Sequence, residues 1–183
     1  MAAQFWYFLL YSFLGFCLEV LFARVTHCPK RDRKCFCILP LCPVYGLGAL
    51  LILALPPAVR ERPLLLFLWA ALSATAAEYG MSLLYEKLVG VAFWDYHHLP
   101  LHLHGRVCLP FSALWGLLGS ILVRLVHPWA EHLAVRLPAA LLFLWVPALT
   151  LDAALTLLLL RREGSTDALR WYRRLPTARA RNA

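Results

Sequence analysis

The sequence predicts an all-α protein, a polytopic membrane helix bundle with about five transmembrane helices. Of its 183 residues, 62% are hydrophobic and 15% are charged, whereas soluble domains average roughly 45–50% and 25%. The hydrophobic residues form runs close to the roughly 20 helical residues that cross a bilayer. These runs take up more than half of the chain, which leaves no room for a soluble catalytic or nucleotide-binding domain.

Five apolar runs define the expected spans. They lie near residues 5–23, 38–59, 63–84, 107–126 and 137–160. At 1.5 Å per helical residue, each approaches or exceeds the ~30 Å of the bilayer core. The first run has no basic residue before it and no small-residue cleavage site after it, so we interpret it as a span and not as a signal peptide. The expected organisation is a transmembrane bundle over residues 1–160 and a basic cytoplasmic tail over residues 161–183.

The basic residues predict the orientation of this bundle. With five spans, fourteen of the eighteen lysines and arginines fall on one side, in residues 24–37, 85–106 and the tail. The positive-inside rule therefore places the N-terminus outside and the C-terminus in the cytoplasm. We expect a multi-pass protein of the cytoplasmic (inner) membrane.

The formal net charge of +8 is best matched by anionic lipid headgroups. The apolar excess is too large for a soluble nucleic-acid binder, so no nucleic-acid partner is expected. In the tail, a short amphipathic helix near residues 166–174 would place Trp171 and Tyr172 at the interface and its arginines on headgroups. The predicted partner of the tail is thus the bilayer.

Three acidic residues inside the expected spans are the first functional candidates. Glu19, Glu78 and Asp152 each fall a few residues from the predicted cytoplasmic end of their span, which places them at one depth. An acid near the centre of a span costs about 2.5–3.5 kcal/mol on insertion scales, so such residues normally face the bundle interior or a wet cavity. We expect one acidic layer that faces inward.

Seven short motifs between about residues 5 and 130 occur in a characteristic order and spacing. They are Tyr11 to Glu19, Pro43 to Gly48, Glu78-Tyr79 followed by Glu86-Lys87, Trp94-Asp95-Tyr96, Gly105 to Leu109, Trp115-Gly116 and His127-Pro128. In these motifs the chain resembles the small membrane proteins of the CmpB-like, ABC-transporter type IV permease family. The resemblance implies a permease-like polytopic membrane protein, and it names no substrate. The chain departs from the family's habit at His97 and His102, where a serine and an asparagine are usual.

The segment 85–106 is the second source of candidates. Phe93, Trp94 and Tyr96 are aromatic residues of the kind that prefers the headgroup level, so we expect this loop to lie on the cytoplasmic face or to re-enter it. Arg106 then either reaches back to water or neutralises one of Glu19, Glu78 and Asp95. Its planar guanidinium also suits a phosphate or carboxylate of a substrate.

Cysteine and histidine gather on the predicted cytoplasmic side. They are Cys28, Cys35, Cys37 and Cys42, with His27, His97, His98, His102 and His104. Thiols stay reduced in the cytoplasm, so no disulfide framework is expected. The Cys-x-Cys spacing without a second regular pair supports zinc weakly, so no cofactor is assigned.

Three classes of function are consistent with these observations. We favour a permease-like component in which an acidic intramembrane site opens to the cytoplasm; its candidate residues are Glu19, Tyr45, Glu78, Glu86, Trp94, Asp95, Tyr96, Arg106 and Asp152. The first alternative is an assembly or interaction subunit of another membrane complex. The second is a membrane-embedded enzyme acting on lipid, which the absence of a recognised nucleophile–base pair makes the weakest. No ATPase motif occurs in the chain, and five spans enclose a pathway poorly, so a homo-oligomer or a separate partner subunit is expected.

Overall fold

The computed structural model describes residues 2–27 and 35–174, and the side chains of 171–174 are left out of the description. Four helical segments are long and apolar enough to cross a membrane. They are α1 (Ala2–Val25), α4 (Pro63–Val89), residues Leu109–Arg136 and residues Ala139–Glu163. The prediction of an all-α membrane bundle is therefore confirmed.

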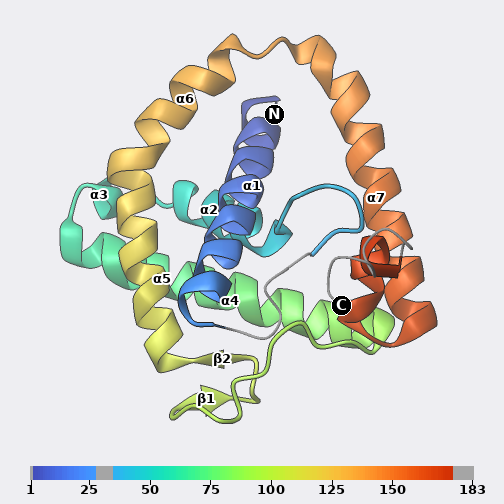
Figure 1. Cartoon of the computed structure of the whole chain (residues 1–183). Helices are drawn as coiled ribbons and strands as arrows, with labels where there is room; N and C mark the ends of the chain where they lie inside the picture. The colour runs from blue at the N-terminus through green and yellow to red at the C-terminus, as the bar shows by residue number, and fades with distance from the viewer. Residues whose placement is uncertain (1, 28–34, 175–183) are drawn as a thin grey trace.

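The third and fourth of these segments are each built from consecutive helical pieces. Residues Leu109–Arg136 comprise α5 (Leu109–Ile121), the π-helical turn η1 (Leu122–Val126) and α6 (His127–Arg136). Residues Ala139–Glu163 comprise the short 3₁₀ turn η2 (Ala139–Leu141) and α7 (Leu142–Glu163). In Figure 1, α5 and α6 run on as one rod along one side of α1, and α7 descends along the other.

The predicted span over residues 38–59 differs from the structure, because it is not one continuous helix. Residues 38–42 are non-helical, α2 (Pro43–Leu53) has 11 residues, and the short α3 (Pro57–Arg60) follows it. Prolines explain this division: a proline disfavours helix at the residue before it, and Pro43 and Pro57 each open a helix where a missing N–H costs nothing. An 11-residue helix extends about 16 Å, roughly half of the bilayer core.

The non-helical segment before α2 obtains its hydrogen bonds from α7. The backbone N–H of Leu39 donates to a carboxylate oxygen of Asp152 over 2.6 Å, and the N–H of Ile38 lies 3.1 Å from both oxygens. The N–H of Cys37 donates to the Thr156 hydroxyl over 2.9 Å. Because lipid offers no hydrogen-bond partners, non-helical backbone at membrane depth persists where protein supplies them.

Small residues let α2 pack between α1 and α4. A Cβ on Gly46 would lie 2.6 Å from the backbone oxygen of Phe8 in α1, and a Cβ on Gly15 would lie 2.6 Å from a ring carbon of Tyr45. Close backbone approach of this kind is the usual basis of helix packing in membranes. This close packing places the side chain of Tyr45 beside Glu19, in the C-terminal half of α1.

Two further elements close the end of the bundle at which α4 stops. The strands β1 (His102–Leu103) and β2 (Val107–Cys108) form an antiparallel hairpin in which His102 pairs with Cys108. The 3₁₀ segment η3 (Thr166–Arg174) packs against α7, with Ala168 and Leu169 buried. The amphipathic helix expected near residues 166–174 is thus a 3₁₀ segment that buries residues in the bundle, and the predicted lipid contacts of Trp171 and Tyr172 lie outside the described side chains.

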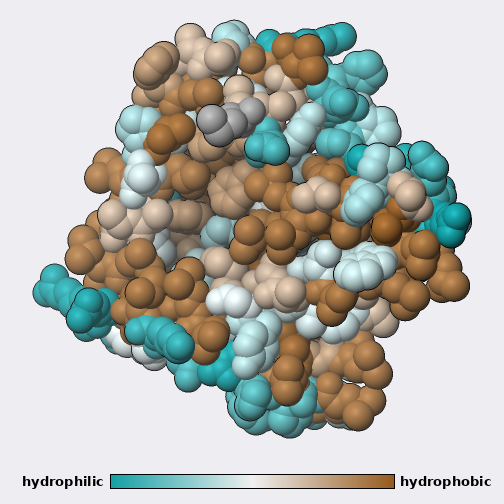
Figure 2. Space-filling view, turned by 180° about the vertical axis from the view of Figure 1, so that it is seen from behind, coloured by the Kyte–Doolittle hydropathy of each residue, from teal (hydrophilic) through white to brown (hydrophobic). Residues whose placement is uncertain are grey.

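The outside of the bundle is apolar, as the expected lipid contact requires. Hydrophobic side chains dominate the face shown in Figure 2, and hydrophilic ones gather towards its margins. The start of α1 and the end of α7 lie at opposite ends of the bundle (Figure 1). The assignment of these ends to the outside and to the cytoplasm stays a prediction.

Candidate functional site

A cavity of about 390 Å³ lies between α1, α2, α4 and α5. Polar or aromatic side chains that line it include Glu19, Tyr45, Glu78, Trp94, Tyr96, Trp115 and Arg170. Of the residues expected from the sequence, the cavity brings together Glu19, Tyr45, Glu78, Trp94 and Tyr96. Glu86, Asp95, Arg106 and Asp152 are not among its lining residues.

Glu78 of α4 is the buried acid of this cavity, with 5% of its surface exposed. The hydroxyl of Tyr96 donates to one carboxylate oxygen over 2.8 Å, and the indole N–H of Trp115 donates to the other over 2.9 Å. Both donors are neutral groups. Tyr96 and Trp115 therefore orient the carboxylate, but neither of them brings a positive charge to it.

Glu19 of α1 belongs to the same network. The hydroxyl of Tyr45 donates to its carboxylate over 2.7 Å, and the ring of Tyr45 meets the ring of Trp115 edge to face, with centroids 5.4 Å apart. The contact between the rings of Tyr45 and Trp115 thus links the donor to Glu19 with a donor to Glu78. The cavity consequently presents two carboxylates in an aromatic wall.

The loop after α4 places Tyr96 against Glu78. Gly90 ends α4 with a φ of 68°, a left-handed conformation that glycine adopts without steric cost. The chain then folds back, because the N–H of Tyr96 donates to the oxygen of Gly105 over 2.8 Å and the indole of Trp94 donates to the oxygen of Arg106 over 2.8 Å. The loop thus packs back on the bundle, and its expected place on the cytoplasmic face stays a prediction.

The pKa of Tyr96 is raised above its ordinary value of 10.0. Burial is the main cause, and the neighbouring Glu78 carboxylate is the second. The neutral phenol is therefore favoured at all physiological pH values. It remains a hydrogen-bond donor to Glu78 throughout this range.

Asp152 does not share the site of the two glutamates, which corrects the expected single layer of three acids. It is 3% exposed and bonds to the backbone of residues 38 and 39. Its carboxylate serves as the acceptor for a non-helical segment, which is a structural task. Spacing along the chain placed the three acids at one depth, but it could not reveal which neighbour each one faces.

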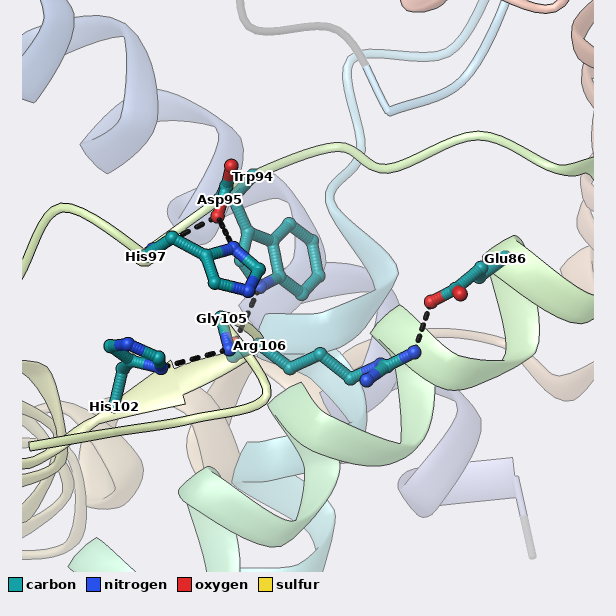
Figure 3. Close-up of polar contacts among 7 residues, drawn as sticks. All are labelled: Glu86, Trp94, Asp95, His97, His102, Gly105 and Arg106. Atoms are coloured by element: carbon teal, nitrogen blue, oxygen red, sulfur yellow. Dashed lines mark hydrogen bonds and ion pairs between the residues drawn. The ribbon is translucent and has the colours of Figure 1, made fainter.

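Arg106 also has a different partner from those expected. Figure 3 shows its guanidinium directed at Glu86, near the end of α4, and the two form an ion pair. The hairpin turn carries Arg106 away from Glu19 and Glu78, so the predicted neutralisation of those acids or of Asp95 is wrong. The carboxylate of Asp95 accepts instead from the backbone N–H of His97, at 2.9 Å, and contacts its ring.

The hydrogen bonds from the backbone N–H and the ring of His97 hold the pKa of Asp95 below its usual range. Figure 3 also shows that His102 bonds locally, since the N–H of Gly105 donates to its ring nitrogen over 3.2 Å. His97 and His102, the two positions that depart from the family's habit, thus both make hydrogen bonds within the loop.

We expect the Arg106–Glu86 pair to contribute little to stability. Its side chains are 17% and 54% exposed, and screened pairs of this kind contribute under about 1 kcal/mol. A double-mutant cycle of Arg106→Ala with Glu86→Gln, followed by thermal melting in detergent, should give a small favourable coupling. The cycle of Arg106→Ala with Glu78→Gln should be additive, and a larger coupling there would contradict the observed pairing.

Sequence reasoning did not select two features of the cavity wall. Trp115 occurs in a quoted motif, but nothing in the motif indicated that its indole bonds to an acid 37 positions away. The π-helical turn η1, whose Leu122 and Val126 line the cavity, leaves no clear pattern in the sequence. Such turns are frequent at functional sites because they redirect side chains within a helix.

No metal centre is formed within the described residues, where three or more His, Cys, Asp or Glu side chains do not gather as ligands. Cys35 and Cys42 line the cavity, and Cys28 lies outside the described residues. The weakly supported zinc site therefore has no described ligand set.

These features define a multi-pass membrane protein with a partly enclosed polar and aromatic cavity. Residues 6–158 match the family described as "Putative ABC-transporter type IV". This match covers more than half of the chain, and the protein belongs to that family, as the motifs indicated. Comparisons with curated proteins and with solved structures give no significant match.

Proposed function

We propose that this protein is a permease-like transport component whose substrate occupies the cavity beside Glu78. The observation that carries the proposal is a carboxylate only 5% exposed that lines a cavity of about 390 Å³ between apolar helices. Ionisable residues within membrane helices are costly, and they are characteristic of substrate and ion pathways. A purely structural acid, such as Asp152, instead bonds to backbone and faces no cavity.

The lining supports an opening on the cytoplasmic side of the inner membrane. Cys35, Trp94 and Thr166 line the cavity, and all three belong to segments that the charge distribution places in the cytoplasm. Because the chain carries no phosphate-binding ATPase motif, ATP-driven transport requires a separate subunit. A second copy or another membrane subunit would complete the far wall of the pathway.

Aqueous accessibility tests this proposal. In a cysteine-free background, we expect Ala74→Cys, which lines the cavity, to react with charged, membrane-impermeant thiosulfonate reagents. The reaction should be faster from the cytoplasmic side, in inside-out vesicles, and measurable from the other side in right-side-out vesicles. A permease pathway is reachable from both sides in alternating states, whereas an enzyme or an assembly subunit has no such requirement.

The matched control is Leu72→Cys, two residues away on α4 at a position 57% exposed on the outer surface. We expect it to stay unreactive from both sides, because it faces lipid. Reaction of Ala74→Cys from neither side, or from one side only, would contradict a transport pathway through this cavity.

A further inference from the structure

We propose that the ligand of the cavity is an organic cation with an apolar body, of the quaternary ammonium or phosphonium type. This inference rests on the proposed function, and it adds the chemical class of the substrate. Three properties of the wall support it: its charge, its aromatic rings and its shortage of oxygen ligands.

The charge of the wall favours a cation. A buried carboxylate must be protonated or offset by a positive charge. Among the ion pairs between described residues, Arg106 pairs with Glu86 and Arg170 pairs with Asp167, and none involves Glu78. Arg170 does line the cavity, but its guanidinium is directed at Asp167. When Glu78 is ionised, a cationic ligand would supply the positive charge that offsets it.

The aromatic rings favour a cation whose charge is spread over an apolar surface. Tyr45, Tyr96 and Trp115 each bond to one of the two acids through a polar atom, and all three also line the cavity. Trp94 and Phe93 also line the cavity. Aromatic rings arranged as a cage are the usual means by which proteins recognise quaternary ammonium ligands.

The coordination chemistry disfavours a bare metal ion. Calcium and magnesium require about six or more oxygen ligands, whereas both oxygens of Glu78 already accept from an N–H or an O–H group. Much of the remaining wall is hydrocarbon, including Leu14, Leu18, Ala74 and Leu118. An anionic ligand would meet the Glu78 carboxylate. An organic cation suits both the acids and the apolar wall.

A pair of ions of matched size and opposite charge tests the inference. We would measure equilibrium dialysis of tritiated tetraphenylphosphonium, and separately of tetraphenylborate, against the purified full chain in detergent, with detergent alone subtracted. We expect saturable binding of the phosphonium ion and no saturable binding of the borate ion. Saturable binding of the borate ion, or none of either ion, would overturn the proposal without the need for any variant.

Variants then locate the site. Glu78→Gln should weaken phosphonium binding roughly tenfold or more, because the charged partner is lost while an acceptor for Trp115 or Tyr96 remains. Glu61→Gln makes the same chemical change at an exposed position outside the cavity, and it should bind as the natural chain does. Equal binding by the Glu78 variant, with its melting temperature retained, would overturn the proposal.

This test fails separately from the test of the proposed function. If Ala74→Cys is labelled from both sides and the phosphonium ion does not bind, the cavity is a pathway for another class of substrate. If the phosphonium ion binds and labelling fails, the cation site stands and the permease function falls.

Discussion

Asp152→Ala is expected to lower the free energy of unfolding by roughly 1–3 kcal/mol. The backbone N–H groups of Ile38 and Leu39 both donate to this carboxylate, which is 3% exposed, and the loss of a buried hydrogen-bonding partner costs about 1–3 kcal/mol. The loss is large because the surrounding bilayer supplies no replacement acceptor. Thermal unfolding of the purified chain in a mild detergent, at constant protein and detergent concentration, would measure it.

Two variants of the same contact calibrate this result. Asp152→Asn keeps one accepting oxygen, so it should lose less stability than the alanine variant. Thr156→Val removes the acceptor of one amide, that of Cys37, and should also lose less. If Asp152→Ala melted at the temperature of the natural chain, the carboxylate would not support the segment before α2.

Gly46→Ala is expected to be the most damaging change of a single methyl group in the bundle. The added Cβ would lie 2.6 Å from the backbone oxygen of Phe8 and would also collide with the Ser12 hydroxyl. Overpacking costs about 1–3 kcal/mol when side chains can yield, and more when they cannot. Here one of the obstacles is a backbone oxygen of α1, which cannot move aside as a side chain can, so we expect a fall in both melting temperature and accumulation in the membrane.

Gly80→Ala in α4 is the matched control for this prediction. Nothing lies within 4 Å of a Cβ at Gly80, and alanine favours a helix over glycine by about 0.8–1 kcal/mol. The variant should therefore be neutral or slightly more stable in the same assay. Equal behaviour of the two variants would mean that α1 and α2 do not approach as closely as described.

The features that follow from composition could be predicted from the sequence. Polar groups are costly in lipid, so helices that cross a membrane consist of long apolar runs. The four membrane-length helices could therefore be predicted from the sequence. The same cost argument indicated that Glu19 and Glu78 face inward, and both line the cavity. Transfer free energies depend on residue type, which a sequence states directly.

The features that depend on particular partners could not be predicted. Hydropathy over residues 38–59 is high whether the segment is helical or extended. Asp152 and Arg106 are charged residues of the kind found in transport pathways. The partner of Asp152, however, is set by the fold of the non-helical segment before α2, and the partner of Arg106 by the β1–β2 hairpin turn. The spacing of residues along the chain does not determine such contacts between distant segments.

The contact between Asp152 and the segment before α2 has a consequence for how the protein is made. Ile38 and Asp152 are separated by 114 positions in the chain, so the acceptor emerges from the ribosome long after the amides that need it. Until α7 joins the bundle, the N–H groups of Cys37, Ile38 and Leu39 lack the side-chain acceptors to which they donate in the folded chain. The segment before α2 can therefore make its final hydrogen bonds only once the last helix has joined the bundle.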